Sequence, residues 1–126
     1  MIDHICIEVS SAERCREIFE DVLSLTRAYS FEIDVEFMSR MFGLNTACEA
    51  VVYSAGDIKI EVFIRPAMEK TGGRISHLCM LLPNREKVLK SAHEKGFDVL
   101  HHPRDGRPLY YIRDHDGNLY EIKESG

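Results

Sequence analysis

The chain has 126 residues, of which 44% are hydrophobic and 29% are charged, and its formal net charge is −5. This composition excludes a disordered chain, and the negative charge argues against nucleic acids and anionic membranes as partners. No apolar stretch approaches the roughly 20 residues that span a bilayer, and the first residues lack a signal-peptide layout, so we expect a cytoplasmic protein.

The first half of the chain predicts a strand, a helix and a hairpin, in that order. Residues 27–46, between the helix and the hairpin, are ambiguous: their first part could be a strand and their second part a short helix. The predicted elements are a strand over 2–9, a helix from Ala12 to about Leu25 capped by Ser10-Ser11, a possible strand over 28–35, a possible helix over 35–42 ended by Gly43, and hairpin strands over 47–54 and 58–65.

The second half predicts the same order of elements after a linker over 66–73 that is rich in glycine and proline. The predicted elements are a strand over 75–82, a helix over 85–95 closed by Gly96, a short strand over 97–101, a strand over 109–113, a turn over 114–117 and a final strand over 118–123.

Four cysteines stand far apart in the sequence, without a CxxC pair. This spacing predicts free thiols in a reducing compartment and excludes an obvious zinc finger. We expect Cys6 and Cys79 to be small core residues rather than soft metal ligands. The four positions are Cys6, Cys15, Cys48 and Cys79.

The two halves also repeat one another in their polar residues. Residues 4–7 (HICI) match residues 77–80 (HLCM), each at the opening of its half, and residues 60–62 (IEV) match residues 120–122 (YEI), each in a last strand. Three like-for-like matches in one order indicate an internal repeat. We predict a single domain over 1–126 made of two modules, at about 1–65 and about 74–124.

Strand alternation places the repeated histidines and glutamates on one side of each module. Neighbouring side chains in a strand point to opposite faces, and the two amphipathic helices should cover the apolar faces. Two glutamates converging on the other face would repel each other unless a cation compensates them. A divalent ion with two neutral imidazoles and two carboxylates is formally neutral, which predicts a metal site made by His4, Glu61, His77 and Glu121.

At these residues the sequence resembles the vicinal oxygen chelate superfamily, which includes glyoxalase I, methylmalonyl-CoA epimerase and bleomycin resistance proteins. The resemblance covers essentially the whole chain and is most specific over 114–122 (DHDGNLYEI), which is similar to the family ending D-P-D-G-x-x-x-E-[LIV] with His115 in place of proline. It implies an α+β fold, in which two βαβββ modules form a cupped mixed sheet around a metal site. The implied metal ligands are His4, Glu61, His77 and Glu121.

The resemblance implies a metal-dependent glyoxalase I-like lyase or isomerase. Proton transfer would occur next to a metal-chelated carbonyl, through an enediolate, with Glu121 as the base and Glu61 as its counterpart. The implied cofactor is a divalent ion, and the ligand types do not choose among Ni, Zn, Co, Mn and Fe. The alternatives are an acyl-CoA epimerase like methylmalonyl-CoA epimerase, with Glu49 as a candidate second acid or base, and a non-catalytic small-ligand or drug-binding protein.

The expected partners are a small-molecule substrate and a second copy of the chain, since short two-module members of the superfamily commonly form homodimers. Among the basic residues, Lys123 and Arg107 are candidates for holding a substrate anion, and Lys123 shares a strand face with Glu121. Glutathione-using relatives often carry arginine and asparagine four residues after the first and second ligands. Here Glu8 and Arg65 stand at those positions, which argues against the usual glutathione pocket.

Overall fold

The computed structural model of the protein describes residues 1–69 and 76–125. The chain divides into two compact units, the first made of residues 1–20 and 24–68 and the second made of residues 21–23 and the described residues from 69 onward. Each unit holds one four-stranded mixed sheet, which confirms the predicted α+β class and its two modules. None of the helices in these ranges has the length and apolar character that crossing a bilayer requires.

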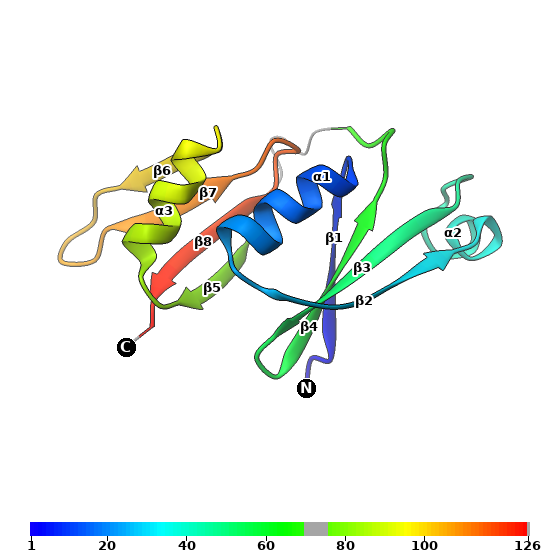
Figure 1. Ribbon diagram of the computed structural model, residues 1–126, viewed down its shortest axis with the longest axis horizontal. Helices are drawn as coiled ribbons and strands as arrows, with labels where there is room; N and C mark the ends of the chain where they lie inside the picture. The colour runs from blue at the N-terminus through cyan, green and yellow to red at the C-terminus, as the bar shows by residue number, and fades with distance from the viewer. Residues whose placement is uncertain (70–75, 126) are drawn as a thin grey trace. The chain divides into compact units, whose positions relative to one another are not determined.

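The first half of the chain follows the predicted order, and the ambiguous stretch becomes a strand and a helix (Figure 1). Its sheet has the strand order β1-β4-β3-β2, with β1 parallel to β4 and the other pairs antiparallel. The elements are β1 (His4–Val9), α1 (Ala12–Cys15) continued by a π-helical segment (Arg16–Val22), β2 (Thr26–Ile33), α2 (Val35–Phe42), β3 (Cys48–Ala55) and β4 (Ile58–Ile64).

Both helices of this half begin at a side chain that caps a backbone amide. The Ser11 hydroxyl accepts a hydrogen bond from the Arg14 amide at 3.1 Å, and the Asp34 carboxylate accepts one from the Phe37 amide at 2.8 Å. Helix α2 ends at Gly43, whose φ of 70° lies in the left-handed region that glycine adopts without strain. The predicted helix boundaries near residues 12 and 42 therefore have a local chemical cause.

The helix that starts at Ala12 covers one face of the first sheet. Phe19 stacks on Tyr53 of β3 with ring centroids 5.2 Å apart, and the Tyr53 hydroxyl donates to Glu20 at 2.7 Å. Val9, Ile60 and Val62 on this face are at most 2% exposed. The covered face is the apolar one, so the alternating polar residues of β1 and β4 lie on the opposite face.

The second half repeats the topology of the first, with strand order β5-β8-β7-β6 and β5 parallel to β8. The predicted strand over 75–82 begins only at Leu78, where pairing with Tyr120 of β8 starts. The linker predicted over 66–73 lies partly outside the described residues. The elements are β5 (Leu78–Leu82), α3 (Arg85–Glu94), β6 (Asp98–His102), β7 (Leu109–Arg113) and β8 (Leu119–Glu124).

The turn between β7 and β8 is held by a buried carboxylate. Asp114 is 7% exposed and accepts hydrogen bonds from the amides of Asp116 and Asn118, from the Asn118 side chain and from the hydroxyl of Tyr120, at 2.8–3.0 Å. Tyr120 itself is fully buried. This network fixes the start of β8 and thereby the position of Glu121, one residue further along.

Candidate metal centre

The first unit brings together His4 of β1 and Glu61 of β4, with His4 Nε2 3.4 Å from Glu61 Oε2. The parallel register places Cys6 beside Glu61, so His4 reaches the glutamate diagonally across the two strands. The other ring nitrogen, Nδ1, lies 3.0 Å from an Asp3 carboxylate oxygen, and this hydrogen bond lowers the pKa of Asp3. Asp3 therefore holds the imidazole with Nε2 directed at Glu61, as outer carboxylates do for histidines that bind metals.

The second unit repeats this pair at the matching positions. His77, immediately before β5, places its Nε2 3.4 Å from Oε1 of Glu121 in β8. The Tyr111 hydroxyl of β7 donates to the same glutamate oxygen at 3.4 Å, and the Tyr111 ring stands edge-on to the His77 ring at 5.9 Å. Glu121 is 8% exposed, so it is a nearly buried carboxylate, and its polar neighbours include the His77 imidazole, the Tyr111 phenol and the Cys79 thiol.

Each pair has the donor chemistry of a transition-metal half-site. The imidazole side chains are 45% and 40% exposed, whereas the glutamate side chains are only 19% and 11% exposed. Imidazole nitrogen and carboxylate oxygen suit Zn, Ni, Co, Mn and Fe(II). Within residues 1–69 and 76–125, no three histidine, cysteine, aspartate or glutamate side chains are gathered closely enough to hold an ion. Each unit therefore presents one histidine and one glutamate as a pair of donors.

Cys6 and Cys79 do not lie in the core, contrary to the prediction. Both are exposed, because alternation places each on the polar face of its sheet, in register with the glutamate of its unit. Desolvation and the nearby Glu61 carboxylate raise the pKa of Cys6 to about 12. All four cysteines are free, as their spacing predicts.

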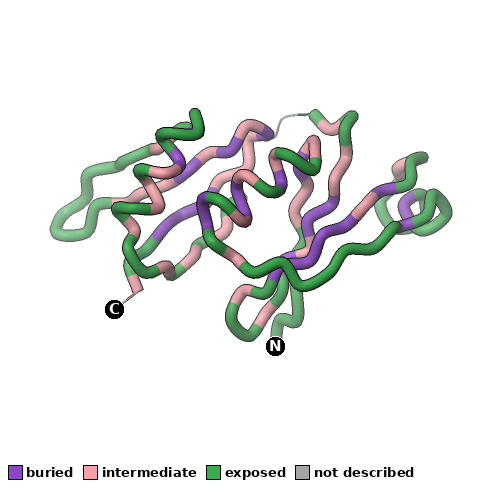
Figure 2. Tube along the Cα trace, in the orientation of Figure 1, coloured by how far each residue is buried: buried purple, intermediate pink, exposed green. Residues whose placement is uncertain are grey.

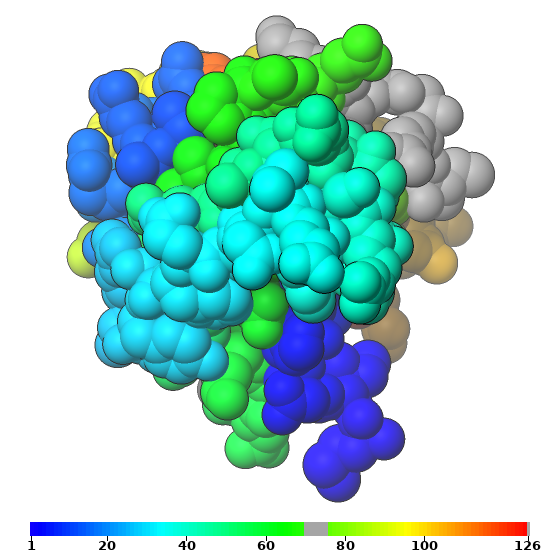
Figure 3. Space-filling view, turned by 90° about the vertical axis from the view of Figure 1, so that its right-hand side faces the viewer, coloured from blue at the N-terminus to red at the C-terminus, as the bar shows by residue number. Residues whose placement is uncertain are grey.

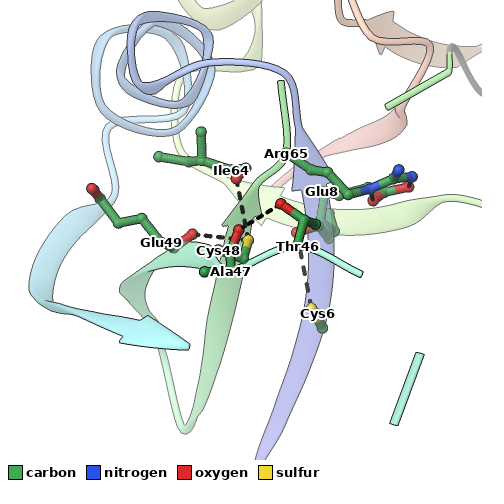
Figure 4. A network of polar contacts seen from close by, with 9 residues as sticks. Cys6, Glu8, Thr46, Ala47, Cys48, Glu49, Ile64 and Arg65 are labelled. Atoms are coloured by element: carbon green, nitrogen blue, oxygen red, sulfur yellow. Dashed lines mark hydrogen bonds and ion pairs between the residues drawn. The ribbon is translucent and has the colours of Figure 1, made fainter. Parts of the chain in front are cut away.

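Glu8 and Arg65, which stand where glutathione-using relatives often carry arginine and asparagine, pair with each other. Arg65 Nε lies 2.7 Å from Glu8 Oε2, and Arg65 Nη2 lies 3.1 Å from Glu8 Oε1 (Figure 4). Both side chains are partly buried, at 21% and 34% exposure. The guanidinium is thus compensated by a carboxylate of its own chain.

Of the two residues predicted to hold a substrate anion, one shares the polar face of its sheet. Lys123 lies two residues after Glu121 on β8 and is exposed. Arg107 lies in the exposed loop between β6 and β7, where its backbone amide donates to the Arg104 carbonyl at 3.1 Å. The charge of Arg104 reaches Tyr111 and acts to lower its pKa, against the stronger raising effect of burial.

A cavity of about 390 Å³ adjoins the His4–Glu61 pair. Its apolar walls come from β2, α2 and β4, and all of its lining residues belong to the first unit. These walls, like Tyr111, were not foreseen from the sequence. The position of Tyr111 could have been predicted, because the turn over 114–117 sets the hairpin register that places Tyr111 opposite Glu121. No sequence pattern predicts the cavity, since it depends on how α2 packs against the sheet.

The sequence profile of the Glyoxalase/Bleomycin resistance protein/Dioxygenase superfamily matches residues 1–122. The chain belongs to this superfamily. Its description covers glyoxalases and dioxygenases, which are enzymes, together with a resistance protein. No curated protein matches the chain.

Solved structures of the superfamily share the fold of this chain at low sequence identity. Fosfomycin resistance protein FosX from Mesorhizobium loti is 21% identical with a TM-score of 0.69, covering 100% of this chain and 92% of its own. A glutamate-to-glutamine variant of FosX from Listeria monocytogenes, solved with Mn(II) and a dihydroxypropylphosphonic acid, is 15% identical with a TM-score of 0.74, covering 100% and 93%. A glyoxalase family protein from Bacillus cereus is 17% identical with a TM-score of 0.73, covering 98% and 92%.

Proposed function

We propose that this superfamily member is a metal-dependent lyase or isomerase of the glyoxalase I type, acting on a small α-hydroxycarbonyl compound or a hemithioacetal. One observation carries the proposal: each unit places one histidine Nε2 at 3.4 Å from one glutamate oxygen, at matching positions of the repeat. A pair repeated with the same geometry is hard to explain by packing alone, since the imidazoles are largely exposed. Ligand binding explains both the repeat and the exposure.

His4, Glu61, His77 and Glu121 would together hold one divalent ion, and two imidazoles with two carboxylates make that assembly formally neutral. The donor set is compatible with Ni, Zn, Co, Mn and Fe. When bound, the ion supplies Lewis-acid stabilisation of charge on a substrate carbonyl oxygen, which makes the adjacent C–H bond more acidic. Asp3 and Tyr111 would orient the first histidine and the last glutamate.

The two glutamates would move the proton. Glu121 would accept the proton from the carbon next to the carbonyl, and that same proton, passed to Glu61, would be delivered to the neighbouring carbon, so the substrate is isomerised and both glutamates end as carboxylates. The lower exposure of the Glu121 side chain, 11% against 19% for Glu61, favours Glu121 as the base because water competes less for it. Glu121→Gln is expected to keep the ion and lose turnover.

The epimerase alternative is weaker in its two-base form, because Glu49 lies on the other face of the sheet. Glu49 of β3 is in register with Ile64 and Glu32, whereas Glu61 is in register with Val52. Figure 4 shows the Glu49 side chain extending away from Cys6 and Glu8. A second acid or base therefore has to be Glu61, as in the glyoxalase scheme.

We further propose that the working form is a homodimer in the cytoplasm. The two His–Glu pairs have to meet around one ion, either within one chain or between two chains. Mixing a His4→Ala variant with a Glu121→Ala variant separates these arrangements. Recovery of turnover in the mixture indicates a site shared between subunits, and no recovery indicates a site within one chain.

The direct test of the activity is an assay on protein reconstituted in turn with Ni, Zn, Co, Mn and Fe(II). Methylglyoxal with several thiols is the substrate, and formation of the thioester or hydroxy acid is followed. Metal-dependent turnover that Glu121→Gln abolishes supports the proposal. Metal binding without turnover of any α-hydroxycarbonyl or hemithioacetal would instead support the non-catalytic alternative.

A further inference from the structure

The cavity beside His4 and Glu61 has strongly apolar walls. Phe31 and Ile33 come from β2, Phe37 comes from α2, and Phe63 comes from β4. The His4–Glu61 pair is the polar end of the same cavity. Its volume of about 390 Å³ lies within the range of small-molecule sites. The cavity is therefore continuous with the proposed metal centre and has room for one apolar group.

Two further residues belong to the lining, and neither carries a positive charge. The Asp34 carboxylate already accepts the hydrogen bond from the Phe37 amide at the start of α2. Glu32 is in register with Glu49, so strand alternation directs its side chain to the opposite face of the sheet. Among the described residues that line this cavity there is no lysine or arginine. An anionic group placed among the phenylalanines would meet aromatic carbons and the Asp34 carboxylate, with no lysine or arginine of the lining to compensate it.

The aromatic walls are accessible rather than buried in the core. Phe31 and Phe37 are 40% and 45% exposed, and Figure 2 shows most of β2 and α2 in the colour of exposed residues, whereas β3 is largely buried. In Figure 3 the cyan side chains of this region spread over one face of the molecule, above the dark-blue N-terminal residues. Helix α2 is held to the sheet by buried Met38, which packs with Ile33 and Phe63.

We infer that this cavity receives an uncharged apolar group of the substrate, aromatic or branched aliphatic, and sets the substrate class. The inference rests on the proposed function. The substrate is then an α-hydroxycarbonyl or hemithioacetal whose oxygens reach the His4–Glu61 end, while its apolar group packs between Phe31, Phe37 and Phe63. Among the described residues of the second unit, no helix stands between β6 and β7, the place that corresponds to α2 between β2 and β3. The lack of lysine and arginine among the described lining residues disfavours a phosphonate or a carboxylate between these rings.

The test compares three α-hydroxyketones that differ only in the group directed into the cavity. 2-Hydroxyacetophenone carries a phenyl group, hydroxyacetone carries a methyl group, and the 4-carboxylate of 2-hydroxyacetophenone carries a charged ring. Titrations followed by NMR chemical shifts give Kd values for the metal-free and the Ni-loaded protein. We expect the phenyl compound to bind at least about tenfold more tightly than either of the others.

Two variants on α2 make the test specific to the cavity. Phe37→Ala removes one wall, while Met41→Ala truncates a side chain that is 57% exposed on the same helix and does not line the cavity. Phe37→Ala is expected to weaken binding of the phenyl compound about tenfold and to leave hydroxyacetone unchanged, and Met41→Ala is expected to change neither. Phe37→Lys should reverse the order and favour the carboxylate.

The outcomes separate this inference from the proposed function. Equal Kd values for the phenyl and methyl compounds, or equal effects of Phe37→Ala and Met41→Ala, would overturn the inference even if the protein turns over methylglyoxal. Tighter binding of the phenyl compound by the metal-free protein, together with no turnover of any substrate, would support the role of the cavity and contradict the glyoxalase-type activity.

Discussion

Arg65 and Glu8 form a two-pronged ion pair that joins the end of β4 to β1, with nitrogen–oxygen distances of 2.7 and 3.1 Å. The backbone supports the same junction, because the Arg65 amide donates to the Val9 carbonyl at 2.8 Å. These two residues stand four positions after Glu61 and His4. The pair therefore occupies the two positions where glutathione-using relatives often carry arginine and asparagine. The charges of Glu8 and Arg65 compensate each other there.

Removing the guanidinium should destabilise the first unit, because Glu8 would keep its charge in a partly buried position. We expect Arg65→Met to lower the free energy of unfolding by about 1 kcal/mol, and the double variant Glu8→Gln/Arg65→Met to recover part of that loss. Urea denaturation measures both. Arg40→Met is the matched control, since Arg40 pairs with Glu36 on the exposed face of α2 and its loss should fall within experimental error. A double variant less stable than Arg65→Met would contradict this view of the pair.

Tyr111 makes the two glutamates inequivalent. It is the cross-strand neighbour of Glu121, whereas the corresponding neighbour of Glu61 is Val52. Because residues that hold a metal ligand in place contribute to metal affinity, Tyr111→Phe should weaken ion binding about tenfold. Isothermal titration with Zn or Ni measures the affinity.

The control for this substitution is the adjacent tyrosine. Tyr110 stacks on His101 at 4.9 Å and lies under the guanidinium of Arg85, away from Glu121 in register. Tyr110→Phe should leave the affinity for the ion unchanged. An equal loss in both variants would show that the effect of Tyr111→Phe comes from general disturbance of β7 and not from its hydrogen bond.

Asp114 should give the second unit a defined pH dependence. Burial raises the pKa of this carboxyl above its ordinary value of 3.8, although its four hydrogen bonds oppose the shift. The folded chain then keeps the proton at higher pH than the unfolded chain. The contribution of Asp114 to stability is therefore largest below 3.8 and is lost as the pH rises through the folded pKa.

Asp114→Asn removes this titration and serves as the reference. The free energy of unfolding of the natural chain, relative to that of Asp114→Asn, should fall as the pH is raised from about 4 toward neutrality. Urea denaturation at a series of pH values measures the difference. A difference that grows with pH would mean that the hydrogen bonds outweigh the burial.

Local sequence signals predicted most of the fold because their causes are local. Ser11 and Asp34 cap helices, Gly43 ends one, and the turn over 114–117 sets a hairpin register. Alternation alone was enough to place His4 and Glu61 on the face opposite the helix, whereas His77 lies just before β5. The 3.4 Å pairing of each histidine with its glutamate required more, since it depends on parallel pairing between strands far apart in sequence.

What could not be predicted depends on packing between distant segments. Cysteine is a residue type typical of cores, but Cys6 and Cys79 lie on the polar faces of their sheets. Nothing in the sequence shows whether such a face is covered by other residues or open to solvent. The cavity beside Glu61 arises because α2 packs against the sheet through Met38, so that Phe37 and Phe63 line the same space. Residues 27–46 were ambiguous in the sequence for the same reason.

The metal content of the purified protein tests the central proposal most directly. We predict one divalent ion per set of four ligands in the natural chain, lost in each of the single variants His4→Ala, Glu61→Ala, His77→Ala and Glu121→Ala. The ion should be retained in Cys6→Ser, which changes the residue in register with Glu61 and none of the four ligands. Elemental analysis after dialysis measures it, with circular dichroism to show that each variant is folded. Unchanged ion content in all four folded variants would contradict the proposed metal centre.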